Sequence, residues 1–204
     1  MSIKRPVREP KQSRGKNSKE KIIETAYNLF CERGYYKTTT IRIAKAAGTS
    51  IGCLYSYFKN KNEIYYEVLK RRNRKFFEIF TEQVDGSEVS KIDKKEWLKV
   101  HIKALIDAQE KSKKLHDDIH VLYYSDHNVA DIVSSQQKKG REIATEFLNF
   151  FKDEVKVQDF EAAAIVFSNM ISSITEEIAY KKSEVDKKRI LNEGVEAILK
   201  YLFR

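Results

Sequence analysis

The sequence TTTIRIAKAAGTSIGCLYSYFKNK, residues 38–61, decides how this chain is organised. Thr39 stands where it can cap a short helix, because its hydroxyl can accept a hydrogen bond from a free backbone N–H of the first turn. Gly48 ends that helix, since glycine readily adopts the left-handed conformation of a sharp turn. Ser50 then caps a second short helix. Two short helices joined by such a turn are the layout of a helix-turn-helix DNA reader.

The two predicted helices have one buried side and one open side. Residues at helical spacing face the core: Ile43, Ala44, Ala47, Leu54 and Phe58. The open side carries hydroxyl groups and small side chains, which suit phosphates and base edges. We expect phosphate contacts from Thr40, Thr49, Ser50, Tyr55, Tyr57 and Lys61, and base contacts from Ile51, Gly52, Cys53 and Ser56. An ordinary helical hairpin inside a core is the alternative.

A longer set of motifs surrounds this helix pair and covers residues from about 18 to 70. The motifs are Leu29-Phe30, Gly34-Tyr35, a Thr pair, an Ile-Ala step, Ala-Gly, Ser-x-Gly-x-Leu-Tyr and a Phe before a lysine. This pattern resembles the DNA-binding domain of the TetR family of transcriptional regulators. Two positions depart from it, because the family often has lysine where Ile51 stands and histidine where Tyr57 stands. The change at Ile51 removes an expected phosphate contact.

The resemblance implies an all-α fold with about nine helices in total. A basic, disordered arm at residues 1–17 would precede a three-helix DNA-binding domain at residues 18–62. Residues 63–204 would form a helical ligand-binding and dimerisation domain. Composition agrees with helices, because both prolines lie in the first ten residues. The arm either follows a DNA groove or is a solvated tail, and the sequence favours neither.

The formal charge of +9 is placed unevenly along the chain. Residues 1–75 hold 19 Lys and Arg against 6 Asp and Glu, whereas the remainder holds 20 against 24. A basic head of this kind is typical of a segment that meets a polyanion, while the near-neutral remainder has another role. A membrane surface would also attract such a head, but the helix-turn-helix pattern favours DNA.

Cysteines and uncharged segments indicate the cellular setting. Cys31 and Cys53 have no metal-like spacing, and we recognise no signal peptide. The longest uncharged run, residues 162–175, has 14 residues and is too short to cross a membrane. We therefore expect a protein of the reducing cytoplasm with no membrane partner.

The last two predicted helices are rich in apolar residues and indicate an association surface. The first begins at about Phe160 and is apolar nearly all round, so it must be buried. Gly194 in the second would permit a close helix crossing. A core within one chain is the alternative, and the resemblance favours a homodimer through these two helices. We expect the interface at Phe160, Ala164, Phe167, Ile171, Ile174, Ile178, Leu191, Val195, Ile198 and Leu202.

By the resemblance, the middle of the chain should hold a pocket for a small-molecule effector. Aromatic and histidine side chains would line it, although each of them is also an ordinary core residue. The candidates are Trp97, His101, His120, Tyr123, Tyr124, Phe147 and Phe167. The expected function is that of a homodimeric repressor, which binds a palindromic operator and is released by its effector.

The sequence His116-Asp-Asp-Ile-His120 offers one further chemistry. Two histidines four residues apart share one helical face, and such a pair can bind a metal ion. No third ligand is fixed by spacing, so we expect a polar face there, no bound metal, no cofactor and no catalytic residue. Two alternative functions remain, a protein that coats DNA without sequence preference and a metal-dependent enzyme that uses this pair.

Overall fold

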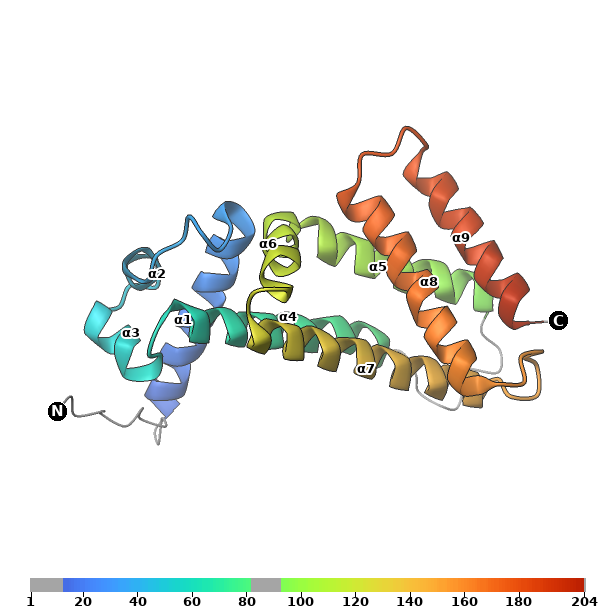
Figure 1. Cartoon of the computed structure of the whole chain (residues 1–204), viewed down its shortest axis with the longest axis horizontal. Coiled ribbons are helices and arrows are strands. Elements are labelled where there is room, and N and C mark those ends of the chain that lie inside the picture. Colours follow the sequence, from blue (N-terminus) through green and yellow to red (C-terminus); the bar gives the residue numbers. More distant parts are fainter. Residues whose placement is uncertain (1–12, 82–92, 204) are drawn as a thin grey trace. The chain divides into compact units, whose positions relative to one another are not determined.

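The computed structural model describes residues 13–81 and 93–203, and within them the chain forms nine α-helices (Figure 1). They are α1 (Ser13–Arg33), α2 (Thr40–Ala46), α3 (Ile51–Tyr57), α4 (Lys61–Thr81), α5 (Lys94–Glu110), α6 (Lys113–Tyr123), α7 (His127–Phe150), α8 (Phe160–Tyr180) and α9 (Lys187–Leu202). An isolated bridge joins Val155 to Phe203, and the described residues form no strand. The all-α prediction is therefore confirmed. Within the same residues, no helix is long and apolar enough to cross a membrane.

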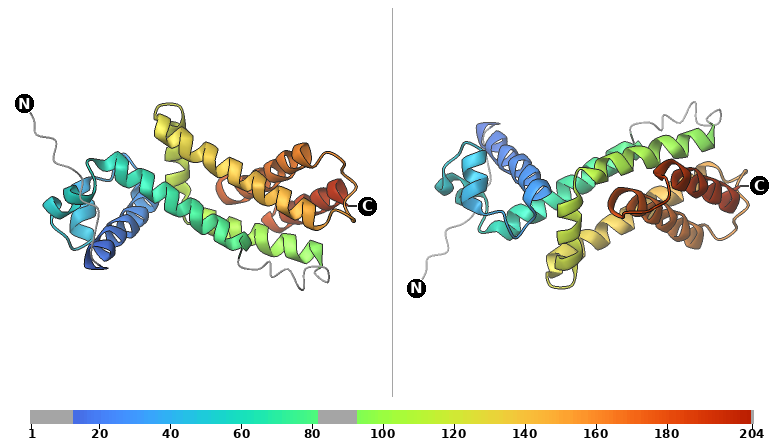
Figure 2. Two further views of the ribbon diagram at one scale, coloured as in Figure 1. Left: turned by 90° about the horizontal axis from the view of Figure 1, so that it is seen from below. Right: turned by 90° about the horizontal axis from the view of Figure 1, so that it is seen from above.

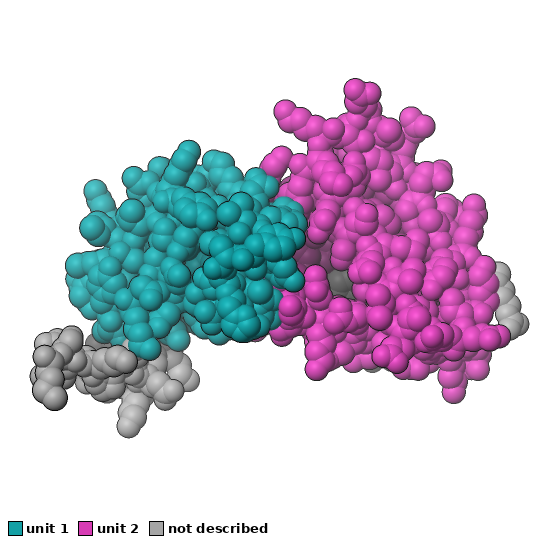
Figure 3. Space-filling view, viewed as in Figure 1, with its two compact units in different colours: residues 1–72, 114–132 teal, residues 73–113, 133–204 magenta. Residues whose placement is uncertain are grey.

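Contacts between residues divide the chain into two compact units, which Figure 3 colours separately. The first unit holds residues 1–72 and 114–132, and the second holds residues 73–113 and 133–204. The chain passes between the units within α4, at the start of α6 and within α7. The sequence predicts a boundary between the DNA-binding domain and the regulatory domain after residue 62. That boundary separates functions, whereas these units are defined by contacts, so it stays a prediction.

The helix pair α2 and α3 forms for the reasons that its end signals predict. The Thr39 side chain accepts a hydrogen bond from Arg42 N, and the Ser50 side chain accepts one from Cys53 N. Gly48 turns the chain between the helices at φ +64°, a conformation that favours glycine. α1 packs against both helices (Figure 2). The core of these three helices contains Ile22, Ala26, Phe30, Ile43, Ala44, Leu54 and Phe58.

Two helices begin earlier than their sequence predicts. α1 begins at Ser13 instead of Ser18, because each residue added to a formed helix gains a backbone hydrogen bond at little cost. α6 begins at Lys113 instead of His116. Lysine is a good helix former, and Leu115 in this first turn is completely buried. The polar composition of the segment concealed this buried position.

Asn60 caps the start of α4. Its Oδ1 accepts a hydrogen bond from Glu63 N at 3.0 Å. The Glu63 carboxylate in turn accepts one from Lys59 N at 2.7 Å, so side chains satisfy two backbone donors of the turn that leads into the helix. α4 extends to Thr81.

The core of the second unit lies where α5, α8 and α9 meet (Figures 1 and 2). α8 and α9 pack closely because Gly194 has no side chain, and a Cβ there would lie 2.5 Å from Ile174 Cδ1. Asp93, Asp159 and Asp186 cap the three helices by accepting hydrogen bonds from backbone N–H groups. Side chains at most 1% exposed in this core are Leu98, Ile102, Leu148, Ala164, Val195, Ile198 and Leu202.

Candidate nucleic-acid interface

α3 turns one side to its own core and leaves the other open. Leu54 is completely buried, whereas Ile51 and Tyr55 are 39% and 49% exposed. Eight of the ten residues predicted to contact DNA lie on α3 or in the turn before it. Ser50, Ile51, Gly52, Tyr55 and Ser56 are exposed, and Thr49, Cys53 and Tyr57 are half-buried. The open face has the predicted composition, and its contact with DNA remains a prediction.

Hydroxyl groups on this face are positioned by neighbours within the chain. The Tyr55 hydroxyl lies 3.0 Å from Thr40 Oγ1, within hydrogen-bond distance, and so joins α3 to α2. Ser50 Oγ caps α3, and Ser56 Oγ donates to Cys53 O at 2.7 Å. Each hydroxyl oxygen retains the capacity for a further hydrogen bond. Tyr55 and Thr40 therefore offer a preformed pair of groups for a phosphate.

Gly52 leaves an opening on the exposed face of α3. Among the described atoms, a Cβ at this position would meet only Ser50 Oγ, at 4.0 Å. Its φ is not positive, so neither backbone strain nor internal crowding requires a glycine here. A glycine inside a helix costs about 1 kcal/mol relative to alanine. The exposed backbone lets another surface approach α3 closely.

Two exposed apolar side chains lie outside the set of predicted DNA contacts. Tyr36 and Ile41 are 62% and 71% exposed. Ile41 stands two positions before the buried Ile43, so helical spacing places it on the opposite side of α2. That signal was present in the sequence.

Lys61, the tenth predicted DNA contact, already contacts another residue of the first unit. Its Nζ donates to Tyr35 O at 2.9 Å and lies 3.8 Å from the centre of the Tyr35 ring. Burial lowers the pKa of Lys61 below its ordinary value, and the charge of Asp118 opposes that shift. The phosphate contact predicted for Lys61 would require it to leave this partner.

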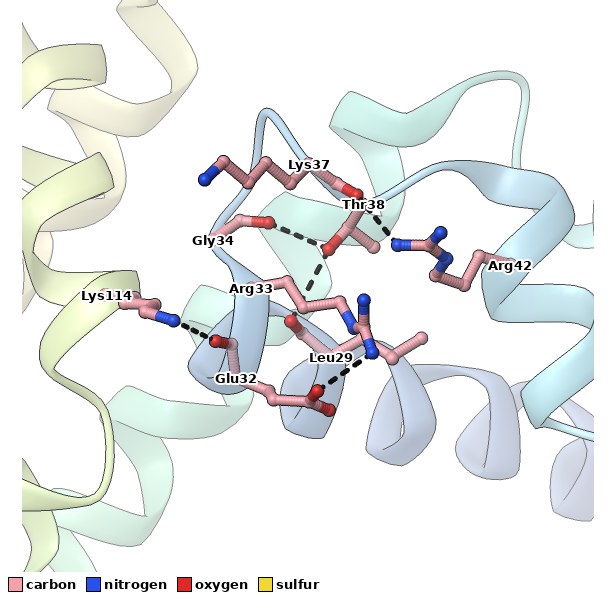
Figure 4. Close-up of polar contacts among 8 residues, drawn as sticks. All are labelled: Leu29, Glu32, Arg33, Gly34, Lys37, Thr38, Arg42 and Lys114. Carbon is pink, nitrogen blue, oxygen red and sulfur yellow. Dashed lines mark hydrogen bonds and ion pairs between the residues drawn. The ribbon is translucent and has the colours of Figure 1, made fainter.

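Side chains also hold the end of α1 and the turn after it (Figure 4). Lys114 Nζ of α6 donates to Glu32 O at 2.5 Å. Thr38 Oγ1, completely buried, donates to Gly34 O at 2.8 Å and lies 3.4 Å from Leu29 O. These contacts satisfy carbonyl groups that the end of a helix leaves without partners.

Asp118 of α6 also binds the turn after α1 through a hydrogen bond. Its Oδ2 accepts a hydrogen bond from Tyr35 N at 2.5 Å. Gly34, at φ +80°, makes room for it, because a Cβ there would lie 2.9 Å from that oxygen. Burial raises the pKa of Asp118, and the Tyr35 N–H opposes the shift. Lys114 and Asp118 are 82 and 83 residues from their partners, and no pattern in the sequence relates them.

Four of the seven residues predicted to line a pocket meet in the core of the second unit. The centre of the Trp97 ring lies 3.9 Å from that of His101 and 5.1 Å from that of Phe147. The Phe147 ring lies 5.3 Å from that of Phe167. The other three residues lie in the first unit, His120 and Tyr123 on α6 and Tyr124 directly after it.

The second unit also contains buried polar side chains. His101 is 2% exposed, its Nδ1 lies 2.7 Å from Trp97 O, and burial lowers its pKa. Gln109 Nε2 donates to Thr175 Oγ1 at 3.4 Å, whereas Gln109 Oε1 has no hydrogen-bond partner among the described residues. An unpaired buried acceptor costs about 1–3 kcal/mol. The sequence prediction missed Gln109 and Thr175, which are 66 residues apart.

The residues predicted to form an association surface lie largely inside the core of their own chain. Six of the ten are buried: Ala164, Phe167, Ile178, Val195, Ile198 and Leu202. The other four are partly buried: Phe160, Ile171, Ile174 and Leu191. The exposed side of α8 is a different face, which carries no charge between Glu161 and Glu176 and is formed there by Ala162, Ile165, Val166, Asn169, Ser172 and Ser173. A helix that is apolar nearly all round does not reveal which side its own chain covers.

Two family models match the chain. The model described as "Bacterial regulatory proteins, tetR family" matches residues 22–68, which include α2 and α3. The model described as "Tetracyclin repressor-like, C-terminal domain" matches residues 76–201, more than half of the chain. Together they account for the helix-turn-helix pair and for the helices that follow it.

Individual proteins agree with these matches. The HTH-type transcriptional regulator HbdR from Aromatoleum sp. (strain CIB) is 35% identical over 85 residues, which are 42% of this chain and 36% of HbdR. The chain matches about a third of the length of its curated relatives.

Solved structures of low identity show the same fold. A protein from Saccharomonospora viridis described as a transcriptional regulator, solved with choline, has a TM-score of 0.73 at 16% identity over 93% of this chain and 99% of its own. SmeT, the repressor of the Stenotrophomonas maltophilia multidrug efflux pump SmeDEF, has a TM-score of 0.67 at 18% identity over 91% and 90%. The fold and both family matches lead to one conclusion: this chain belongs to the TetR family of bacterial regulatory proteins.

Proposed function

We propose that this protein is a sequence-specific regulator of transcription that reads operator DNA with α3. One observation carries the proposal: the exposed face of α3 has an open backbone at Gly52, with polar and apolar side chains around it. The major groove of DNA admits a helix, and a groove-bound helix needs close approach. Ile51 would contact a thymine methyl group. The other proposed contacts are Thr40, Thr49, Ser50, Tyr55, Tyr57 and Lys61 with phosphates and Cys53 and Ser56 with bases.

The placement of charge supports DNA as the partner. Residues 1–75 carry 19 Lys and Arg against 6 Asp and Glu, yet α3 itself contains no charged residue. Much of the attraction to phosphates would then come from cations outside α3, such as the exposed Lys45 and Lys59. Side chains on α3 would select the sequence. Operator DNA of bacteria lies in the cytoplasm, and we propose that the protein is located there.

We infer that the protein acts as a homodimer through α8 and α9. The uncharged face of α8 supports this, because Ile165 and Val166 on it are 43% and 42% exposed. The partly buried residues of the predicted interface remain part of the proposal: Phe160, Ile171, Ile174 and Leu191. A two-fold dimer would present two copies of α3 to half-sites about 34–36 Å apart, and the operator would be nearly palindromic.

The aromatic core of the second unit is the proposed effector site. Trp97, His101 and Phe147 would give it flat walls of aromatic rings. The S. viridis protein was solved with choline and SmeT is a repressor, which supports a repressor that responds to a small molecule. An effector that binds better to a state with displaced DNA-reading helices, by about 1–3 kcal/mol, would release the operator. No step of this scheme is catalytic.

Selection of tightly bound genomic fragments at about 0.15 M salt tests the proposal. The full-length protein should recover one nearly palindromic motif, because α3 adds sequence preference to the general attraction of the basic head. Tyr55→Ala should lose this motif. Tyr124→Ala is the matched control, because that tyrosine is 88% exposed, lies on the segment after α6 and is not among the proposed DNA contacts.

The same selection can contradict the proposal. Recovery of fragments with no shared motif by the wild-type protein would describe a protein that coats DNA without sequence preference. Recovery of the same motif by wild type and Tyr55→Ala would mean that α3 does not read the operator through this residue.

A further inference from the structure

We propose that His116 and His120 of α6 form a chelating site for one divalent transition-metal ion of the copper and nickel class. The two histidines stand four residues apart on one helix, and their Nε2 atoms lie 2.9 Å from each other. The proposed DNA-reading and effector functions leave this pair of side chains without a role.

The distances between the two rings are those of side chains that share an ion. An imidazole nitrogen binds such an ion at about 2.0–2.1 Å. Two nitrogens at right angles around one ion would lie about 2.9 Å apart, with ring centres about 4.5 Å apart. The observed separations are 2.9 Å and 4.4 Å. The two nitrogens lie within hydrogen-bond distance of each other, and a bound ion would take the place of the proton that they share.

The donor atoms determine which class of ion fits. Imidazole nitrogens suit Cu²⁺, Ni²⁺ and Zn²⁺, whereas Mg²⁺ and Ca²⁺ require oxygen ligands. A right angle between neighbouring ligands belongs to square-planar and octahedral coordination, which Cu²⁺ and Ni²⁺ adopt. Zn²⁺ prefers tetrahedral sites and fits this pair less well. Cu²⁺ should bind most tightly, because it stands highest in the affinity order of these ions.

The surroundings of the pair select among the possible ions. Arg72 lies close enough for its charge to act on His116, and that positive charge would oppose any bound cation. Only an ion that gains much from nitrogen coordination should overcome this repulsion, which again favours Cu²⁺ over hard cations.

The chain supplies two ligands and leaves the other coordination positions open. Among the described residues, no group of three or more histidine, cysteine or acidic side chains is placed to hold an ion. Water or a donor group of a small molecule would complete the coordination. α6 also carries Lys114 and Asp118, which hold the end of α1 and the turn after it. A metal bridge across one turn of α6 would stiffen that hold.

Calorimetric titration of the full chain with CuCl₂ at neutral pH tests the proposal. The protein must be prepared without a polyhistidine tag. The wild type should bind one Cu²⁺ at this site, and His116→Gln and His120→Gln should each weaken binding by about tenfold or more, because a single imidazole cannot chelate. His127→Gln is the matched control, since this exposed histidine pairs with Asp131 at the start of α7 and should behave as wild type.

Electron paramagnetic resonance of the Cu²⁺-loaded protein gives a second readout that does not depend on affinity. The wild type and His127→Gln should show two coordinating imidazole nitrogens, and each site variant should show one. Circular dichroism of the variants checks that their helices are retained. No stoichiometric Cu²⁺ binding by the wild type, or equal affinity in the wild type and both site variants, would overturn the proposal. MgCl₂ should produce no binding signal in any of them.

Discussion

Gly52 and Gly140 both lie inside helices, and the comparison between them separates helix stability from DNA binding. Among the described atoms, a Cβ at Gly140 would meet nothing within 4 Å, and one at Gly52 would meet only Ser50 Oγ. Neither glycine has a positive φ. Alanine at either position should therefore raise the free energy of unfolding by about 0.5–1 kcal/mol, measured by urea denaturation, because alanine loses less backbone freedom on folding.

Operator binding should distinguish the same two variants. Gly52→Ala places a methyl group on the face of α3 that we propose enters the major groove, so the dissociation constant should rise by about tenfold, equal to about 1.4 kcal/mol. Gly140→Ala lies on α7 and should bind the operator as the wild type does. Equal affinity of both variants and the wild type would show that Gly52 does not lie against DNA.

The lowered pKa of His101 predicts how the stability of the fold depends on pH. Burial lowers its pKa below the ordinary value of 6.5, so the folded chain binds fewer protons than the unfolded chain near that pH. Its contribution to stability is complete above pH 6.5 and is lost as the pH falls below that value. The lowered pKa of His116 acts in the same direction.

Urea denaturation between about pH 7 and pH 5 measures this effect. His101→Gln should make the decline of stability with falling pH less steep than in the wild type. His127→Gln, at an exposed position, should follow the wild type. A decline equally steep in His101→Gln would mean that this histidine is not the group that resists protonation.

At the scale of elements, helix ends were predictable because their signals act over a few residues. Thr39, Gly48 and Ser50 cap or end α2 and α3 as predicted, since each acts on a backbone group no more than four positions away. The start of α6 was less predictable. Its lysines read as a polar link, while the burial of Leu115 in the same turn depends on tertiary packing.

Contacts between distant elements were beyond prediction from one sequence. Asp118 reaches Tyr35 across 83 residues, and Gln109 reaches Thr175 across 66. Each of these side chains is an ordinary polar residue of a helix until its partner is known. The same limit applies to α8, because its apolar residues point both into the chain's own core and out to solvent. Its composition predicted burial, while the direction of burial depended on α5 and α9.

The hold of α6 on the turn after α1 gives a prediction at this scale. Asp118→Ala removes the acceptor of the Tyr35 N–H, so the free energy of unfolding should fall by about 1–3 kcal/mol. Hydrogen exchange at the Tyr35 amide should become faster, which a general loss of stability would not confine to this turn. Asp117→Ala is the control, because that carboxylate is exposed beside it. An unchanged exchange rate at Tyr35 in Asp118→Ala would contradict the role given to α6.

At the scale of the whole molecule, the question is what covers the exposed face of α8. Apart from Glu161 in the first turn, the exposed residues of α8 carry no charge, while most exposed residues of the neighbouring helix α9 do. A single helix-turn-helix unit contacts a short half-site, and a second copy linked to the first binds with a high effective concentration. Dimerisation through this face would therefore account both for the missing charges and for tight operator binding.

Val166→Lys tests this argument with little risk to the fold, because Val166 is 42% exposed within the single chain. A lysine there would place two like charges in a two-fold interface and leave each without a partner, so sedimentation equilibrium should show a monomer. Operator affinity should fall by about a hundredfold, since each chain would then bind its half-site alone. Val100→Lys on α5, at a position 45% exposed, should remain dimeric and bind as the wild type does. A Val166→Lys protein that stays dimeric would place the interface on another face, and the uncharged surface of α8 would then need a different partner.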